Sequence, residues 1–383
     1  MSRPRRILFV QYAHPSGFPP IERAARTFHA SGWDVRIIGT RGLNTDSLGV
    51  EQLSAVDVRL SSRAGHGMVQ KLQYLGFLLR GILHVIRWRP AWVYVSDPMA
   101  TPVGLVAVML GSRVAYHEHD APVDERPSRF IRVTLAARRM LLRSARIVIT
   151  PNDERSAAIS VDASGRNVVT VWNCPLVTEV AAQRTPGPRS NILKLVYHGS
   201  IVPGRPPMTV IEAIARAEGS VELTIAGYEP NGARGHVAQL LRRASDLRVS
   251  DRITVLPAMP RHQLLRIAAA SDIGLSFMPS LGLNSNERRM AGASNKAFEY
   301  LASGLALIVS DLPDWRRIFI DAHVAWACDP ADVDAIVVLL NRALLNRDEV
   351  AAMGERGRRL VIDRWNYENR FAPVLHAISS TGR

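Results

Sequence analysis

The sequence predicts an α/β protein built from two doubly wound domains. Short apolar runs suited to parallel strands alternate with amphipathic helical segments over residues 6–172 and again over residues 193–313. Between these halves, residues 179–191 are polar and proline-containing, which suits an interdomain linker. A chain of 383 residues is long enough for two domains that each bury a core. The expected N-terminal domain, linker, C-terminal domain and final segment are residues 1–180, 181–191, 192–365 and 366–383.

The N-terminal domain opens with the order strand, loop, helix and strand. Residues 6–12 read as an apolar strand, and 13–20 as a loop rich in turn-forming residues. A helix is expected over 21–30, where Gly32 ends it, and a second strand over 34–39. This order is the opening of a Rossmann-like half.

A long helix and further strands complete this domain. The helix is predicted over residues 68–89, with an apolar side formed by Leu72, Leu75, Leu79, Ile82, Leu83 and Ile86 and with interspersed Lys71, Arg80, Arg87 and Arg89. The strands are expected at residues 93–96, 114–116, 146–150 and 168–172. The strand at 114–116 runs into His117-Glu118-His119-Asp120, at the carboxyl end where open α/β sheets place ligands.

A basic amphipathic helix is predicted within residues 126–146. No Asp or Glu occurs from 126 to 152. A helical wheel places five arginines in one stripe, Arg129, Arg132, Arg139, Arg143 and Arg146, and leaves Arg138 outside it. The adjoining side carries Phe130, Val133, Ala137, Met140 and Leu141. Such a helix suits an anionic membrane surface, and it equally suits a solvated face whose apolar side packs on the sheet.

The second half repeats the alternation of strands and helices. Its strands are expected at residues 193–198, 221–226, 253–256, 273–277 and 305–309. Its helices are expected at residues 208–216, 237–247, 262–270, 296–303, 331–346 and 349–365.

Composition narrows the class of protein. The 47% hydrophobic and 21% charged residues are those of a soluble globular protein. The net charge of +14 predicts attraction to a polyanion, whether nucleic acid, anionic lipid or a phosphorylated substrate. Nucleic acid is not expected as a partner, because basic and aromatic residues do not interleave and no helix-turn-helix, zinc or RNA-binding signature occurs.

Targeting and redox signals point to the cytoplasm. Only a short apolar run, residues 7–10, follows the N-terminal arginines, so no secretory signal is expected. The longest uncharged apolar segment, residues 98–112, is shorter than the ~20 residues that a bilayer requires. Two cysteines, Cys174 and Cys328, make neither a disulfide framework nor a metal cluster, although the sequence leaves their pairing open.

Residues 283–313 combine a polar loop, a helix and a buried strand. The loop, 284–294, is rich in Asn, Gly, Arg and Ser, and Gly304 ends the helix that follows. A loop that enters a helix N-terminus favours an anion, because the first N–H groups are unpaired and the helix dipole is positive there. Glu299 in this helix therefore needs a hydroxyl or a cation to face it.

The same stretch resembles the GT-B retaining glycosyltransferases of family 4. The resemblance is carried by the segment Asn295-Lys296-Ala297-Phe298-Glu299-Tyr300-Leu301-Ala302-Ser303-Gly304, which closes over a nucleotide sugar in that family. It implies two Rossmann-like domains facing across a cleft, an acceptor-side first domain, a donor-binding second domain and a last helix that returns to the first domain. By this resemblance Glu299 holds the donor ribose, and Asn295 and Lys296 belong to the donor site. A family glutamate that touches the transferred sugar is Ala291 here.

The donor diphosphate has to be neutralised as the sugar leaves. Either a metal held by carboxylates or protein cations at a helix N-terminus can do this. No Asp-x-Asp motif in a suitable setting occurs, so we expect neither metal nor cofactor. Gly199 lets backbone approach a phosphate, and Arg205 takes the place of the family's basic residue after the glycine turn. Ser200 replaces a second arginine of many members, and Lys296 is a candidate to compensate.

The acceptor side is expected to use His119 and Gly17. By resemblance His119 forms a hydrogen bond near the reacting carbon, and Gly17 lies where the family has a glycine loop beneath the sugar. A buried structural histidine and a simple turn glycine are the respective alternatives. His117 and His119 would point to opposite sides of an extended segment, so no metal site is expected between them. Asp120 is a weaker candidate to orient His119.

The expected function is retaining transfer of a hexose from a nucleoside-diphosphate sugar. The leaving phosphate oxygen helps to deprotonate the incoming hydroxyl, so catalysis rests on positioning and charge. We expect a lipid-linked or polysaccharide acceptor, with the protein peripheral on the cytoplasmic face of the membrane. The alternatives are a nucleotide-sugar epimerase on this fold and a binding or scaffold protein, which the replacements Ala291 and Ser200 favour.

Overall fold

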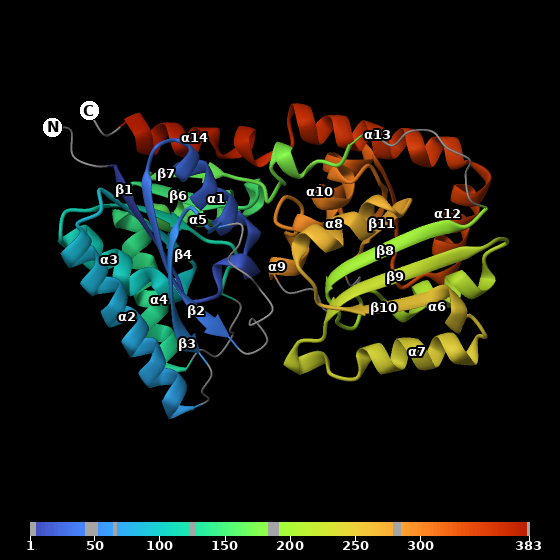
Figure 1. Ribbon diagram of the computed structural model, residues 1–383, viewed down its shortest axis with the longest axis horizontal. Coiled ribbons are helices and arrows are strands. Elements are labelled where there is room, and N and C mark those ends of the chain that lie inside the picture. Colours follow the sequence, from blue (N-terminus) through green and yellow to red (C-terminus); the bar gives the residue numbers. More distant parts are fainter. Residues whose placement is uncertain are drawn as a thin grey trace. The chain divides into compact units, whose positions relative to one another are not determined.

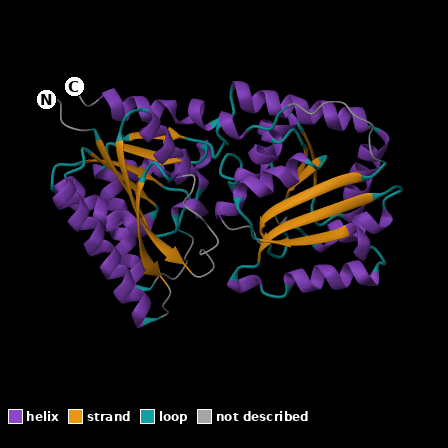
Figure 2. Ribbon diagram, viewed as in Figure 1, coloured by secondary structure: helices purple, strands orange, loops and turns teal. Residues whose placement is uncertain are grey.

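The computed structural model describes residues 5–42, 53–63, 67–122, 128–182, 191–278 and 285–380. The chain divides into two compact units, Met1–Asn173 with Tyr367–Arg383, and Cys174–Asn366. Each unit is a wholly parallel sheet with helices packed on it (Figure 2), so the predicted α/β class with two Rossmann-like domains is confirmed. Residues 174–180 belong to the second unit in this division, whereas the sequence analysis assigned them to the first domain.

The first unit has a seven-stranded sheet in the order β3-β2-β1-β4-β5-β6-β7 (Figure 1). The strands are β1 (Arg6–Gln11), β2 (Asp34–Gly42), β3 (Asp57–Arg63), β4 (Trp92–Ser96), β5 (Arg113–His117), β6 (Ile147–Thr150) and β7 (Asn167–Thr170). The helices are α1 (Pro19–Ala30), α2 (Met68–Trp88), α3 (Thr101–Met109), α4 (Arg129–Ser144), α5 (Asp153–Ala163) and α14 (Tyr367–Ser380). The direction of the chain across the sheet reverses between β1 and β4, which is where folds of this type bind ligands.

The two faces of this sheet have separate apolar cores. On one face Val10, Val95 and Val114 pack against helices α2 to α5. On the other face the Phe9 ring stacks on Tyr94, and Phe28 of α1 meets Phe371 of α14 edge-on at 5.5 Å. The last helix therefore contributes directly to the core of the first unit.

The second unit has a six-stranded sheet in the order β10-β9-β8-β11-β12-β13. The strands are β8 (Leu193–Ser200), β9 (Val221–Tyr228), β10 (Ile253–Pro257), β11 (Ile273–Ser276), β12 (Ala306–Ser310) and β13 (Ala325–Cys328). The helices are α6 (Met208–Arg216), α7 (His236–Asp246), α8 (Arg261–Ala269), α9 (Ser285–Arg288), α10 (Asn295–Ala302), α11 (Pro313–Trp315), α12 (Val333–Leu345) and α13 (Arg347–Asp363). Buried Val, Leu and Ile fill the strands, as expected for a parallel sheet covered on both faces.

Three elements differ from the sequence prediction. The edge strands β3 and β13 were not predicted, because β3 contains only two apolar residues, Val58 and Leu60, and β13 is only four residues long. The segment 284–294, predicted as loop, contains the one-turn helix α9, and its first residue lies outside the described residues. Part of the predicted linker, 183–190, also lies outside them, whereas Val177–Glu179 form a 3-10 turn.

Two further expectations concern cysteines and membrane spans. Cys174 and Cys328 are buried free thiols. Among the helices of the described ranges, none combines the length and the hydropathy that crossing a bilayer demands.

Candidate functional site

The donor-side site begins where β8 ends. Gly199 has φ 118 and lies in register with Gly227 of β9, where an added Cβ would stand 1.8 Å from the Gly199 carbonyl oxygen. An added Cβ at Gly199 itself would stand 2.8 Å from Cε of Lys296. The two glycines therefore let adjacent strands and the Lys296 side chain meet at one point, and only glycine adopts this backbone geometry readily.

Arg205 is presented by a tight turn after β8. Val202 and Arg205 exchange two backbone hydrogen bonds, with N···O distances of 3.1 and 2.7 Å, around Gly204 at φ 83. Nη2 of Arg205 donates to Oε1 of Glu287 in α9 at 3.2 Å, and both side chains are largely buried. The residue is thus held within the site region rather than extended into solvent.

Lys296 lies in the first turn of α10, next to Gly199. Burial and the positive charge of Arg205 lower the pKa of Lys296 to about 8, while Glu299 opposes that shift. Its Nζ lies 5.4 Å from the centre of the Tyr197 ring. At neutral pH this region therefore holds two cations that repel each other, an arrangement that an anion between them would stabilise.

Glu299 is buried and faces cationic and polar side chains. Its Oε1 accepts from Nε of Arg261 at 3.0 Å, and Arg261 also binds the carboxylate of Glu179. Oε2 lies 3.6 Å from Nε2 of His198, whose pKa burial lowers to about 4, so the imidazole is neutral at pH 7. Arg261 is thus the cation that the sequence analysis expected opposite Glu299, although neither Arg261 nor His198 was singled out there.

Helix α10 is fixed from both sides. The Tyr300 hydroxyl oxygen accepts from the backbone N–H of His198 at 2.8 Å, and its ring covers Gly274, where a Cβ would lie 2.3 Å from the ring. On the other side Gly357 of α13 packs against Leu301. A Cβ added at Gly357 would lie 2.4 Å from Cδ2 of Leu301. These contacts set the position of Asn295 at the start of the helix and of Glu299 one turn later. Ala291, which replaces the family glutamate, is buried.

His119 is the candidate on the first unit. Its backbone N–H donates to Oδ1 of Asp97 at 2.8 Å, and Arg155 donates to its carbonyl oxygen. Burial, with the charge of Arg155, lowers the pKa of His119 to about 3. Among the described residues neither imidazole nitrogen of His119 has a hydrogen-bond partner. The ring is therefore neutral and available to donate to, or accept from, a hydroxyl group.

His117 packs against His119 instead of pointing away from it. The ring centroids are 3.8 Å apart, so the prediction of opposite directions is wrong. The reason is that side chains two residues apart in an extended chain point to the same side, so the rings of His117 and His119 meet. The Tyr94 hydroxyl lies 2.6 Å from Nδ1 of His117. No group of three potential metal ligands occurs within the described ranges.

Asp97 is a residue that sequence reasoning missed. It has φ 64 and ψ 164, a backbone conformation that costs about 1–3 kcal/mol for any residue but glycine. Burial raises its pKa to about 8. The sequence does not show that the backbone of Asp97 is strained. The position of Asp97 directly after the predicted strand at 93–96 was nevertheless a signal that could have marked it as a candidate. Asp120, predicted to orient His119, instead lies 3.5 Å from Nη1 of Arg155 and is mostly exposed.

Gly17 lies close to this histidine region. It ends the 3-10 turn Pro15–Gly17, and its N–H donates to the carbonyl oxygen of His14 at 3.0 Å. The ring of the next residue, Phe18, lies 6.2 Å from the ring of His119. The turn accounts for Gly17 as a structural residue, and its role beneath a sugar stays a prediction.

The arginines of α4 divide as the helical wheel predicts. Arg138 is held by both carboxylate oxygens of Glu118, which also accepts from the Tyr116 hydroxyl. The stripe residues Arg132, Arg139, Arg143 and Arg146 are exposed. The apolar side differs from prediction in part, since Ala137 and Leu141 are buried but Val133 and Met140 are exposed. Arg126 and the side chains of Arg129 and Phe130 lie outside the described parts of the chain.

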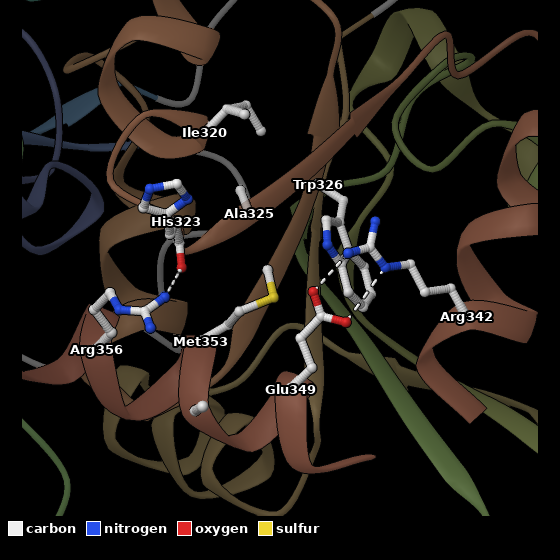
Figure 3. Close-up of a pocket in the computed structure, with 9 residues that line it drawn as sticks. Ile320, His323, Ala325, Trp326, Arg342, Glu349, Met353 and Arg356 are labelled. Carbon is white, nitrogen blue, oxygen red and sulfur yellow. Dashed lines mark hydrogen bonds and ion pairs between the residues drawn. The ribbon is translucent and has the colours of Figure 1, made fainter. Parts of the chain in front are cut away.

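A pocket of about 370 Å³ lies elsewhere in the second unit, beside the edge strand β13 (Figure 3). None of the predicted site residues lines it. Its polar groups already have partners, because Arg342 binds Glu349 over the Trp326 ring and Arg356 donates to the His323 carbonyl oxygen. The chemistry points to the carboxyl edge of β8 and the start of α10, so we do not assign the donor site to this pocket.

Two family models match the chain in the places where the two units lie. A glycosyl transferase 4-like domain matches residues 20–174, and a glycosyl transferase-like model matches residues 208–376. Curated relatives include a D-inositol 3-phosphate glycosyltransferase of Mycolicibacterium smegmatis, 31% identical over 119 residues, or 30% of this chain and 27% of the relative. A GDP-mannose-dependent alpha-(1-6)-phosphatidylinositol monomannoside mannosyltransferase of the same organism is 24% identical, with 39% and 38% covered. The alignments thus span well under two thirds of these relatives.

Solved structures match over nearly the full length. HepE of Anabaena, in complex with UDP and glucose, aligns with a TM-score of 0.73 at 16% identity and covers 98% of this chain and 100% of that one. WaaG, a glycosyltransferase involved in lipopolysaccharide biosynthesis, aligns with a TM-score of 0.66 at 14% identity, with 97% and 99% covered. At such identity these likenesses show the fold. Together with the two family models they establish that this chain belongs to the GT-B glycosyltransferases of the group 1/4-like kind.

Proposed function

We propose that this protein is a retaining, metal-independent glycosyltransferase that moves a hexose from a nucleoside-diphosphate sugar to a hydroxyl acceptor. One observation carries the proposal. The side chain of Lys296, in the first turn of α10, packs against Gly199, and the turn from Val202 to Arg205 follows the strand that holds Gly199. Two cations and the unpaired N–H groups of a helix N-terminus suit a diphosphate. Glu299, one turn into that helix, suits the two hydroxyls of a ribose. The solved HepE complex with UDP supports the same class of donor.

Charge stabilisation is the main contribution of the second unit to the reaction. As the bond between the sugar carbon and the phosphate oxygen breaks, negative charge grows on the diphosphate beside Arg205 and Lys296. The acceptor oxygen forms its bond on the same face of the sugar, and its proton passes to the leaving phosphate oxygen. Configuration is retained, atoms and charge balance, and neither a metal nor a dedicated base is required.

His119 is proposed to form a hydrogen bond with a hydroxyl of the substrate. A neutral imidazole can donate one hydrogen bond and accept another, and the low pKa of His119 keeps it in that form at physiological pH. Asp97 and Arg155 hold its backbone on either side and so position it. Asp97 and Arg155 are therefore positioning residues in this proposal.

The acceptor is proposed to be a lipid-linked or polysaccharide glycan at the cytoplasmic face of the membrane. The exposed arginines of α4 supply attraction to anionic headgroups, which would bring the protein to such an acceptor. The name of one relative specifies a phosphatidylinositol monomannoside. Cytoplasmic location with peripheral attachment belongs to the same proposal.

Thermal unfolding against a panel of nucleoside diphosphates and nucleotide sugars tests the donor site. A ligand at 100 times its Kd adds about 2.7 kcal/mol to the free energy of unfolding. We expect one nucleotide to stabilise the protein, and both Arg205→Ala and Glu299→Ala to remove that effect. Arg316→Ala is the matched control, because Arg316 pairs with Asp311 on the surface of the same unit. Addition of EDTA should leave the shift unchanged.

The alternatives make different predictions in the same experiment. A scaffold protein with a degenerate donor site would show no shift with any nucleotide, and that result would contradict the transferase proposal. Slow hydrolysis of the donor sugar without acceptor separates an active site from simple nucleotide binding. An epimerase would convert the sugar of the donor and leave the bond to phosphate intact.

A further inference from the structure

Helix α2 has two apolar faces, and only one is used by the core. Tyr74, Phe77 and Val85 are buried against the sheet and α3, and the Tyr74 hydroxyl donates to the Met99 carbonyl oxygen at 2.9 Å. Gly81 lets α2 approach α3 closely, since a Cβ there would lie 3.0 Å from Val103. The aromatic face is thus the packing face, and the leucine-rich side that the sequence showed is the other one.

The leucine-rich side of α2 is exposed along the whole helix. We call it the α2 stripe, and its residues are Met68, Val69, Leu72, Leu75, Leu79, Leu83 and Ile86. Each is between 43% and 67% exposed. These seven are among eighteen large hydrophobic residues exposed in the described chain, so exposed apolar surface is concentrated on this one helix. Single exposed apolar residues are ordinary, whereas a contiguous stripe marks an interaction surface.

Cations border the α2 stripe on both sides. At 3.6 residues per turn, Lys71 lies along one edge, and Arg80 and Arg87 lie along the other. All three are exposed, and α2 contains no Asp or Glu from Met68 to Trp88. Long cationic side chains can keep their charges in a polar layer while their stems follow an apolar surface.

Charge selects the partner of this surface. A second copy of the chain would bring another helix of the same positive sign against it, and the whole chain already carries a net charge of +14. An aliphatic stripe bordered by cations and free of acids complements the acyl boundary and anionic headgroups of a phospholipid layer. The 21 residues of α2 span about 30 Å at ~1.5 Å per residue, so the contact would be extended.

We propose that the α2 stripe docks the protein on an anionic phospholipid bilayer, with α2 lying parallel to the membrane plane. Figure 1 shows α2, α3 and α4 over the same sheet, and α3 packs against both neighbours. The exposed arginines of α4 therefore belong to the same helix layer as the stripe. Burial of leucines provides an attachment that survives salt, which the charges of α4 alone would not provide. Vesicle binding requires no nucleotide, so this inference stands apart from the donor site.

Vesicle flotation tests the stripe directly. The purified protein is mixed with vesicles of phosphatidylcholine alone or of phosphatidylcholine with phosphatidylglycerol, and its partition is measured at low and high salt. We expect binding to the anionic vesicles, and a fall of about 10-fold or more for the Leu75→Asn/Leu79→Asn double variant, because two side chains lose their apolar contact. The Lys71→Gln/Arg80→Gln/Arg87→Gln variant should bind more weakly at low salt and show less dependence on salt.

The matched control places the same change on another helix. Val338 and Leu345 of α12 are 64% and 80% exposed, so Val338→Asn/Leu345→Asn removes similar apolar surface without touching α2. Equal thermal stability and equal nucleotide binding of both double variants would show that the fold and donor site are intact.

Four results would overturn the inference. Unchanged vesicle binding by Leu75→Asn/Leu79→Asn would exclude the stripe, and loss only with Arg132→Gln/Arg139→Gln/Arg143→Gln would assign attachment to α4. A dimer that dissociates in the leucine variant, without vesicle binding by the parent protein, would identify a second copy as the occupant. No binding to either kind of vesicle would exclude a lipid partner.

Discussion

The carboxyl edges of the two sheets carry opposite kinds of polar groups. In the second unit the edge of β8 and the start of α10 hold the acidic and basic side chains Arg205, Lys296 and Glu299. In the first unit the edges of β4 and β5 hold groups whose neutral forms are favoured, because burial lowers the pKa of His117 and His119 and raises that of Asp97. Both edges are buried in the same kind of fold.

The difference lies in whether a buried group has a partner of opposite charge. Glu299 has Arg261, and Arg205 has Glu287, so each of these buried side chains faces a group of opposite charge. Around the two histidines, the Tyr94 hydroxyl lies beside His117 and the Asp97 carboxylate accepts from the backbone N–H of His119, while the charges of Glu118 and Asp120 are paired with Arg138 and Arg155. An edge with charges suits a charged diphosphate, and an edge with neutral donors and acceptors suits the hydroxyls of a sugar or acceptor.

The largest effect is expected from a substitution at the carboxyl edge of the first sheet, where His119 lies. His119→Ala removes the proposed hydrogen bond near the reacting carbon, and loss of one such positioned donor costs about 100-fold in rate. We expect kcat for donor hydrolysis or transfer to fall by that factor, while nucleotide binding by thermal shift is retained. His84→Ala is the control, because His84 of α2 contacts Arg59 of β3 and none of the proposed site residues. Equal loss of nucleotide binding in His119→Ala would argue against a division of roles between the edges.

A smaller effect is expected at the charged edge when pH is raised. Lys296 has a pKa of about 8, so about nine tenths of it is protonated at pH 7 and about one tenth at pH 9. A nucleoside diphosphate is already fully ionised in this range, because its last pKa is about 6. If the protonated lysine binds the phosphate, affinity should therefore fall about 10-fold from pH 7 to pH 9.

Titration calorimetry at several pH values measures this dependence. Lys296→Arg keeps its charge throughout the range and should bind with an affinity that does not change with pH. Persistence of the pH dependence in that variant would assign it to a different group.

The smallest effect is expected on the free energy of unfolding, from Asp97 at the carboxyl edge of the first sheet. The pKa of Asp97 is raised from 3.8 to about 8, so folding takes up a proton between these values and stability falls as pH rises through that window. Asp97→Asn mimics the neutral form. We expect it to add on the order of 1 kcal/mol at pH 7, or about 2–4 °C in Tm, and nothing at pH 4. A stabilisation of equal size at both pH values would contradict the raised pKa.

Much of the fold was predictable because it depends on local patterns. The strands β1, β8 and β12 are short apolar runs, so periodicity located them within a residue or two. The candidate donor-side residues Gly199, Lys296 and Glu299 were grouped in the sequence analysis with the help of the resemblance to the family 4 glycosyltransferases. The edge strand β3 was missed because it has few apolar residues, and β13 because it is only four residues long.

The amphipathic pattern of α2 shows where sequence information ends. Both faces of this helix are apolar, and periodicity alone cannot say which one enters the core. In the structure α2 packs on the sheet and α3 through Gly81 and its aromatic side chains, so its leucine-rich face is exposed to solvent. Only the packed arrangement of α2 on the sheet and α3 decides that choice.

Local chemistry along the chain thus specified the α/β class, most element boundaries and the residue types of the donor site. The pairing of buried charges was decided by tertiary structure, because the partners come from separate elements. Arg261 meets Glu299 across 38 residues, and Arg138 meets Glu118 across 20. A sequence pattern records which side chains share a face, whereas the neighbours of that face exist only after the elements have packed.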